Sequence, residues 1–146
     1  MGEGALPWEL PLGATPAGEG RTTFRVWAPR ASGVAVTTGG AETALSPEGL
    51  GVFAATVSAS PGDAYRYVID GGARLPDPCS RFQPEGVRGP SRVVDPGAFA
   101  WTAEGWTGLD RDDLVIYELH VGTFTPEGTF AAAAARLGEL AALGVT

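Results

Sequence analysis

Glu118 and His120 have the side chains of this chain best suited to acting on a polar substrate. They lie two positions apart in an alternating segment, 115–121, so a strand there would place both on one face. A carboxylate and an imidazole on one face can bind substrate, or they can form a hydrogen-bonded structural pair. We favour the structural pair and keep Glu118 and His120 as candidate substrate-binding residues.

The elements that must position this pair are a strand, a turn and a helix. The alternation predicts a strand over 115–121, and Thr129 is a suitable N-cap for a helix over 130–143. Gly144 would end that helix, and 145–146 would begin another strand. This order is typical of parallel α/β folds such as the (β/α)8 barrel, in whose first strand both polar side chains would point inward. The predicted turn contains Gly122, Pro126 and Gly128.

The N-terminal half of the chain contains short alternating segments separated by turn residues. They predict strands at 22–28, 33–38, 52–57, 64–70, 74–75 and 92–95. Intervals of about ten residues without a helical period indicate a small immunoglobulin-like β-sandwich, so the chain as a whole is expected to be mainly β. We expect a loosely ordered N-terminus over 1–20, a sandwich over 21–96 and the start of a (β/α)8 barrel over 97–146.

Residues 76–113 are rich in proline and glycine, yet they also contain aromatic residues. A flexible linker would be polar and poor in aromatics, so we expect an ordered segment, beginning at residue 76, that joins the sandwich to the next domain. Its three arginines could contact sugar hydroxyls, but we favour contacts with carboxylates or backbone carbonyls of the neighbouring domain. These arginines are Arg81, Arg88 and Arg92.

Composition argues against several classes of function. The net charge of −7 disfavours nucleic acid and anionic membrane as partners. One histidine, one cysteine and no lysine leave no multi-histidine or cysteine metal site and no phosphate-binding loop, so we expect neither metal nor organic cofactor. Cys79 cannot form an internal disulfide and is expected to be a small, buried or half-buried filler. Without a signal peptide or a membrane-length apolar run, the chain is expected to be a soluble cytoplasmic protein.

Three stretches resemble a known family. They read FRVWAPRASGVAV (24–36), PDPCSRFQPEGVRGPSRVVDP (76–96) and YELHVGTFTPEGTF (117–130). The third resembles the first barrel strand of the α-amylase superfamily of glycoside hydrolases, and the first resembles the immunoglobulin-like domain that precedes such barrels. Together with the second, they are most similar to the malto-oligosyltrehalose trehalohydrolase family.

The resemblance implies a retaining α-glycosidase, 4-α-D-{(1→4)-α-D-glucano}trehalose trehalohydrolase, that needs no cofactor. It would hydrolyse the α-1,4 bond next to the terminal trehalose of maltooligosyl trehalose and release trehalose, a step of trehalose biosynthesis. The family's catalytic carboxylates follow the fourth, fifth and seventh barrel strands, so no catalytic residue is assigned in this sequence. The chain is therefore expected to be the N-terminal portion of a longer enzyme, inactive until the rest of its barrel is present.

Two alternatives stay open. One is the N-terminal part of a glycogen branching or debranching enzyme, against which residues 125–130 favour the trehalohydrolases. The other is a non-catalytic glucan-binding sandwich, which would need exposed aromatic residues. Some relatives of this domain bind starch or glycogen through tryptophans near the positions of 37–51, but this chain has no aromatic residue there. Trp27 is assigned to packing in the core or at a sheet edge.

Overall fold

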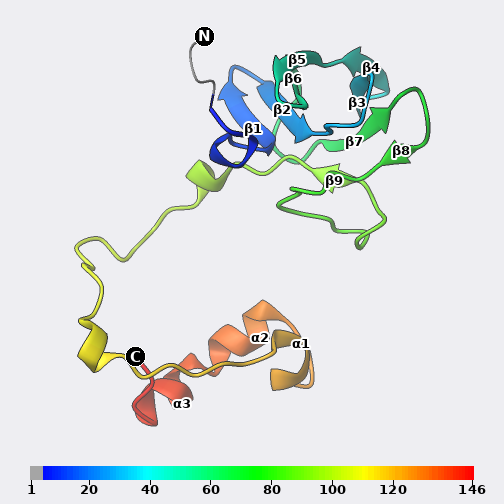
Figure 1. Cartoon of the computed structure of the whole chain (residues 1–146). Helices are drawn as coiled ribbons and strands as arrows, with labels where there is room; N and C mark the ends of the chain where they lie inside the picture. Colours follow the sequence, from blue (N-terminus) through cyan, green and yellow to red (C-terminus); the bar gives the residue numbers. More distant parts are fainter. Residues whose placement is uncertain (1–4) are drawn as a thin grey trace. The chain divides into compact units, whose positions relative to one another are not determined.

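The computed structural model describes residues 5–146, and the chain divides into two compact units, Met1–Ala100 and Trp101–Thr146. The first unit is built of β-strands, and the second of short helices and extended chain (Figure 1). Within the described part, no helix has the length and apolar character that crossing a membrane requires.

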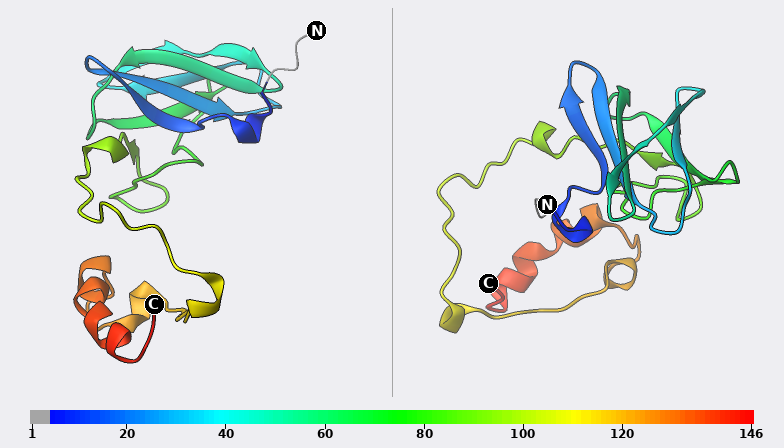
Figure 2. Two further views of the ribbon diagram at one scale, coloured as in Figure 1. Left: turned by 90° about the vertical axis from the view of Figure 1, so that its left-hand side faces the viewer. Right: turned by 45° about the horizontal axis from the view of Figure 1, so that its top comes forward.

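The first unit contains two antiparallel sheets, in agreement with the predicted sandwich. One sheet has the order β1-β2-β6-β5, and the other has the order β4-β3-β7-β8, with β9 also paired to β7. Figure 2 shows the long strands of this unit running side by side. The strands are β1 (Gly13–Gly18), β2 (Arg21–Trp27), β3 (Val34–Thr38), β4 (Ala41–Ala44), β5 (Ser46–Gly49), β6 (Val52–Ser58), β7 (Ala64–Ile69), β8 (Arg74–Leu75) and β9 (Ser91–Arg92).

The core of the sandwich follows from the alternation of its central strands. In β2 every second residue is buried, and Phe24 is completely inaccessible to solvent. Its ring meets the edge of the Tyr65 ring from the opposite sheet, with ring centroids 4.8 Å apart. Val36 and Tyr67 are also buried in this cluster, so both sheets contribute side chains to one core.

Three strands were not predicted from the sequence, and the expectation of a loosely ordered N-terminus is wrong over β1. That strand pairs with β2 from Gly13 to Gly18, after a short 3₁₀ helix, η1 (Pro7–Glu9). β4 and β5 lie at sheet edges with every residue exposed, so they show no apolar alternation. The chain therefore forms strands wherever a neighbouring strand offers backbone partners, even without a local pattern.

The second unit departs from the predicted strand over 115–121. Residues 114–120 have no strand partner in the described part of the chain, and Val121 already begins helix α1 (Val121–Phe124). A strand is defined by its ladder, so extended chain without a neighbour does not form one. Two further 3₁₀ helices lie earlier in the chain, η2 (Pro96–Ala98) and η3 (Arg111–Asp113).

The predicted helix over 130–143 forms as two consecutive helices, α2 (Phe130–Ala135) and α3 (Leu137–Ala142), that meet at Arg136. Thr129 caps α2 as predicted, because its hydroxyl accepts a hydrogen bond from the Ala132 N–H at 3.2 Å. The helix ends just before Gly144, also as predicted. Gly138 lies near the start of α3 and is a poor helix former, which agrees with the interruption beside it.

Candidate functional site

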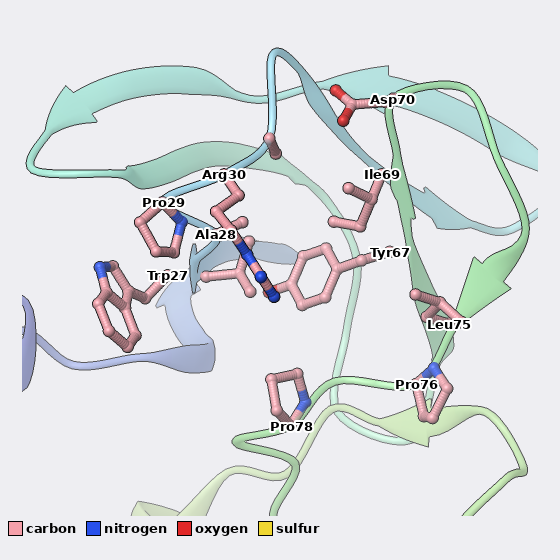
Figure 3. Close-up of a pocket in the computed structure, with 12 residues that line it drawn as sticks. Trp27, Ala28, Pro29, Arg30, Tyr67, Ile69, Asp70, Leu75, Pro76 and Pro78 are labelled. Atoms are coloured by element: carbon pink, nitrogen blue, oxygen red, sulfur yellow. The ribbon is translucent and has the colours of Figure 1, made fainter.

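The sandwich contains a pocket of about 450 Å³ at the end of β2 and β7, which we call the Trp27 pocket (Figure 3). The loop that follows β2 forms one side, and the end of β7 together with the first residues of the 76–113 segment forms the other. The lining residues are Val26, Trp27, Ala28, Pro29, Arg30, Ala31, Tyr67, Ile69, Asp70, Leu75, Pro76 and Pro78. Their mixture of apolar and polar side chains is typical of a ligand site.

Trp27 stands at the mouth of the pocket with 51% of its surface exposed. Its indole N–H donates a hydrogen bond to the Leu50 carbonyl at 3.1 Å, which fixes the ring against the neighbouring turn. The expected packing in the core or at a sheet edge is therefore not observed, because Trp27 is half exposed at the end of β2, an interior strand of its sheet. Because the indole N–H is already hydrogen-bonded, the exposed surface of Trp27 that is left for further contacts is apolar.

The loop that follows Trp27 is held by the turn between β5 and β6. The Ala28 N–H donates to the Gly51 carbonyl at 2.8 Å. Gly51 has a φ of +78°, and a Cβ at this position would overlap the Cα of Pro29. The close contact between Gly51 and Pro29 therefore requires glycine and fixes one wall of the pocket.

Asp70 holds the opposite wall. One oxygen of its carboxylate, Oδ1, accepts hydrogen bonds from the N–H groups of Ser32 and Gly33, each at 2.8 Å. Its own N–H donates to the Gly33 carbonyl at 2.9 Å. These bonds join the end of β7 to the loop before β3. Its second oxygen, Oδ2, has no hydrogen-bond partner among residues 5–146.

Between these walls lie a buried tyrosine and an exposed arginine. Tyr67 is 1% exposed, its hydroxyl donates to the Arg25 carbonyl at 3.4 Å, and burial raises the pKa of its phenol well above the ordinary value. Arg30 lines the pocket and is exposed, and it makes no hydrogen bond or ion pair within the described residues. Figure 3 shows the Arg30 side chain extending from the loop into the pocket.

The 76–113 segment begins on the sandwich through Asp77, which is 3% exposed. The Asp77 carboxylate accepts hydrogen bonds from the Tyr65 hydroxyl at 2.6 Å and from the Cys79 N–H at 2.7 Å. The Asp77 N–H in turn donates to the Ser91 hydroxyl at 3.0 Å. Burial raises the pKa of the Asp77 carboxyl and outweighs the opposing effect of the Tyr65 hydrogen bond. The start of this segment is therefore ordered, as the sequence predicted.

Two of the three arginines in this segment donate to backbone carbonyls, and these carbonyls belong to the sandwich itself. Arg81 donates to the Ala14 carbonyl at 2.8 Å, and Arg92 donates to the Gly62 carbonyl at 3.4 Å. Arg88 is exposed and has no such bond within the described residues. The predicted contacts with backbone carbonyls are thus confirmed for Arg81 and Arg92. The carbonyls belong to the sandwich, however, and not to a neighbouring domain as predicted.

Cys79 is exposed, which corrects the expectation of a buried or half-buried filler. Its backbone N–H bonds to Asp77 in a surface turn, so its position follows from the buried aspartate and not from packing of the thiol. Partial burial and the nearby Asp77 carboxylate raise the pKa of the thiol above its ordinary value, which disfavours a reactive thiolate.

Glu118 and His120 are both exposed in the second unit, and no side-chain hydrogen bond joins them within the described residues. The His120 carbonyl accepts from the Thr123 and Phe124 N–H groups, each at 3.0 Å, at the start of α1. A Cβ at Gly122 would lie 3.0 Å from the His120 ring, so glycine leaves room for the imidazole. The roles of Glu118 and His120 stay predictions.

The sequence missed the pocket because it depends on contacts between distant segments. Leu50, Asp70 and Pro76 lie far from Trp27 along the chain, and no local pattern connects them. The signal that was available is the WAPR run at the end of an alternating strand, in which a proline stands two residues after a tryptophan.

Comparison with known proteins confirms the predicted resemblance. The chain is 48% identical over 136 residues to malto-oligosyltrehalose trehalohydrolase of Deinococcus radiodurans, which covers 92% of this chain and 22% of that protein. The enzyme of the same name from Saccharolobus solfataricus is 42% identical over 131 residues, covering 88% and 23%. The chain thus spans less than a quarter of the length of these relatives.

Solved structures of glucan-processing enzymes are also similar to this chain. A putative α-amylase from Salmonella typhimurium matches 93% of this chain and 24% of its own, with a TM-score of 0.85 and 43% identity. The pullulanase SAP of group B Streptococcus matches 92% of this chain and 23% of its own, with a TM-score of 0.66 at 24% identity, so it supports the fold alone. The model of carbohydrate-binding module 48 (isoamylase N-terminal domain) matches residues 11–96. Because that match covers more than half of the chain and coincides with the sandwich, this protein belongs to the carbohydrate-binding module 48 family.

Proposed function

We propose that this chain is the N-terminal part of a glycoside hydrolase that cleaves the α-1,4 bond next to the terminal trehalose of maltooligosyl trehalose, releasing trehalose. The observation that supports this most is the 48% identity to the Deinococcus radiodurans enzyme over 92% of the chain. An alignment of that extent includes both the sandwich and the YELHVGTFTPEGTF stretch. The proposed substrate is an α-glucan with a trehalose end.

The second unit supports the proposed start of a (β/α)8 barrel over 97–146, after a sandwich over 21–96. The Thr146 N–H donates to the Val115 carbonyl at 3.2 Å, and the Val115 N–H donates to the Thr146 hydroxyl at 2.9 Å. The chain therefore returns, after α3, to the beginning of the extended 114–120 segment. This return is what a strand–helix–strand unit requires before two parallel strands can pair.

The same unit leaves apolar side chains uncovered. Ile116 is 84% exposed, and Tyr117 is 50% exposed. In the proposed enzyme, later barrel strands and helices would cover these residues. Within that barrel Glu118 and His120 remain candidate substrate-binding residues.

In this proposal the catalytic carboxylates lie in other parts of the enzyme, and this chain supplies the sandwich and the first barrel elements. A retaining mechanism needs a nucleophile and an acid/base, with a covalent glycosyl-enzyme intermediate. No metal or organic cofactor is required. The cytoplasmic location of the enzyme stays a prediction from the sequence.

A chimaera tests the proposal. Residues 1–146 replace the matching stretch of the Deinococcus radiodurans trehalohydrolase, and trehalose release from maltooligosyl trehalose is measured. We expect kcat/KM within about tenfold of the parent enzyme, since a misplaced barrel strand costs more than that. The control chimaera has the equivalent stretch of the streptococcal pullulanase SAP and should be far less active. A folded chimaera of residues 1–146 that releases no trehalose would contradict the proposal, as would trehalose release by residues 1–146 alone.

The first alternative, a glycogen branching or debranching enzyme, is not better supported than the proposed trehalohydrolase. The trehalohydrolases are 42–48% identical to this chain in the two comparisons given above, whereas the streptococcal pullulanase is 24% identical. Glucan binding by the sandwich is compatible with the proposed enzyme and is supported by the carbohydrate-binding module 48 match.

A further inference from the structure

We propose that a second pocket of the sandwich, on the sheet that contains β3 and β7, binds the phosphate group of a small phosphorylated molecule. A site of this kind goes beyond the proposed glycosidase activity, whose substrate carries no charge. The pocket, which we call the arginine pocket, has a volume of about 400 Å³, within the usual range for small-molecule sites. Its lining residues are Thr37, Thr38, Gly39, Gly40, Ala64, Tyr65, Arg66, Arg74 and Pro90.

The two arginines of this pocket are brought together by strand pairing. Arg74 pairs with Val68, which lies two residues after Arg66 in β7, so both arginine side chains leave the same face of the sheet as diagonal neighbours. The Arg66 guanidinium donates to the Arg74 carbonyl at 3.4 Å, which holds the half-buried Arg66 side chain beside β8. Like charges at neighbouring positions of a sheet repel each other, and an anion between them would remove that repulsion.

The positive charge of the arginine pocket has no counter-charge nearby. The chain contains 17 acidic residues, yet no carboxylate lines this pocket, and neither Arg66 nor Arg74 forms an ion pair within residues 5–146. Glu42 is on the same face, but β4 lies two strands from β7, which is about 10 Å at the usual strand spacing. The Asp63 carboxylate is engaged by the Ser60 N–H at 2.8 Å. A bound anion would therefore be the first group to neutralise this pair of arginines.

The turn between β3 and β4 adds backbone donors to the same pocket. Gly39 and Gly40 have φ values of +56° and +83°, and their N–H groups donate to no acceptor within the described residues. A Cβ at either glycine would meet no atom within 4 Å, so nothing covers the turn. Consecutive N–H groups in such a turn attract anions, and the Thr38 hydroxyl beside them is a further donor.

This set of groups fits a phosphate better than it fits a neutral sugar or an acidic protein. A phosphate can accept hydrogen bonds from two guanidiniums and from backbone N–H groups at the same time. A neutral sugar would leave both cations without a partner, and the Tyr65 ring packs on Phe24 in the core, where it cannot stack on a sugar. An acidic protein segment would need a surface far larger than this pocket.

The turn between β5 and β6, on the other sheet, is a matched control within the same molecule. Leu50 and Gly51 have φ values of +50° and +78°, so the backbone conformation is similar to that of the β3–β4 turn. The arginine beside this second turn, Arg25, already forms an ion pair with Glu48 at 2.7 Å. We therefore expect no phosphate to bind there.

Titration of residues 1–146 with glucose 6-phosphate, followed by NMR of the backbone amides, tests the proposal. The amide signals of Gly39 and Gly40 should shift and saturate with a Kd of about 0.1–5 mM, while those of Leu50 and Gly51 should not move. Glucose, which lacks only the phosphate, should shift none of the four signals. Raising the NaCl concentration from about 50 to 300 mM should weaken the binding of glucose 6-phosphate several-fold.

Three variants locate the binding on the arginines. Arg74→Gln should weaken glucose 6-phosphate binding about fivefold or more, because a charged hydrogen bond to the phosphate is lost. Arg66→Gln should have a similar effect. Arg30→Gln, which removes another exposed arginine outside this pocket, should leave the affinity unchanged. The Arg74 side chain makes no bond within the described residues, so Arg74→Gln remains informative even if Arg66→Gln fails to fold.

Several results would overturn the proposal. They are unchanged Gly39 and Gly40 signals, equal shifts of the two turns, an equal response to glucose, and equal losses of affinity for Arg74→Gln and Arg30→Gln. Binding of inorganic phosphate without binding of glucose 6-phosphate would exclude a phosphorylated molecule as the ligand. Tighter binding of a poly-glutamate peptide at the same signals would identify an acidic protein segment in its place. Trehalose release by the chimaera depends on none of these results.

Discussion

The two units of this chain differ in how completely they cover their apolar residues. In the sandwich, Phe24, Val36 and Tyr67 are at most 1% exposed. In the second unit, Phe130 is 81% exposed and Leu143 is 78% exposed. Both units show well-patterned apolar residues, so the difference is not one of composition.

Topology explains the contrast. Antiparallel strands find partners across short turns, and every ladder of the sandwich joins strands of Met1–Ala100. The partner of a parallel strand follows only after a helix. In the second unit the chain returns after α3 to the extended 114–120 segment, and a single backbone hydrogen bond, from Thr146 to Val115, joins the two. The sandwich therefore has its own core, whereas the second unit has few buried contacts and should open at low free-energy cost.

The largest expected effect compares two phenylalanines. Phe24→Ala should lower the free energy of unfolding of the sandwich by about 4 kcal/mol, because it leaves a cavity beside Tyr65. Phe130→Ala removes the same atoms from an exposed position and should change that free energy by less than about 0.5 kcal/mol. Urea denaturation of residues 1–146 measures both. Similar losses for the two variants would show that the unfolding of the sandwich depends on the second unit.

The next effect concerns the buried carboxylate of the sandwich. Asp77→Ala should lower the free energy of unfolding of the sandwich by about 2 kcal/mol, because it leaves the Tyr65 hydroxyl and the Cys79 N–H without a partner. Asp112→Ala, an exposed control in the second unit, should be neutral within about 0.5 kcal/mol. Both variants are compared by thermal denaturation, and a neutral Asp77→Ala would mean that the 76–113 segment is not anchored there.

The third effect is confined to the second unit. Gly138→Ala should stabilise the α2–α3 region by about 1 kcal/mol, because alanine is the better helix former and a Cβ there meets no atom within 4 Å. Hydrogen exchange of the α3 amides should slow by about fivefold, and the unfolding of the sandwich should not change. A shift in the sandwich transition would indicate that the two units are energetically coupled.

The smallest expected change in stability comes from removing the ion pair of Arg25 and Glu48, whose N–O distance is 2.7 Å. The Arg25 hydrogen bond lowers the pKa of Glu48 below its ordinary value of 4.5, so the pair stabilises the fold above that pH and this contribution is lost as pH falls through the folded pKa. Glu48→Gln should therefore cost about 0.5 kcal/mol at pH 7, after allowance for solvent screening, and nothing at pH 2. A cost that persists at pH 2 would contradict a charge effect.

Asp77 should show the opposite pH dependence. Burial raises its pKa above the ordinary 3.8, so the folded state retains a proton that the unfolded chain releases. The stability of the wild-type chain relative to Asp77→Asn should be highest below pH 3.8 and should decrease as pH rises through the folded pKa. Denaturation of Asp77→Asn and Glu48→Gln between pH 2 and pH 8, each compared with the wild-type chain, gives the change of stability with pH that each carboxyl causes. Changes of the same sign would show that the pKa shift of one of the two carboxyls has the opposite direction.

The sequence by itself determined the main strands, the helix cap and the family. Alternation fixes which residues of β2, β3, β6 and β7 face inward, because the side-chain period of a strand is independent of its partner. Thr129 caps α2 through a bond within one turn, which local sequence is enough to specify.

Tertiary structure alone decided the rest. The edge strands β4 and β5, the burial of Asp77 and the exposed, fixed ring of Trp27 all depend on partners distant in sequence. Conversely, the alternating residues 114–120 form no strand, because a ladder needs a paired strand and within the described chain only Thr146 meets them, at Val115. Local pattern sets the orientation of a side chain, whereas pairing and burial depend on which distant segments pack against it.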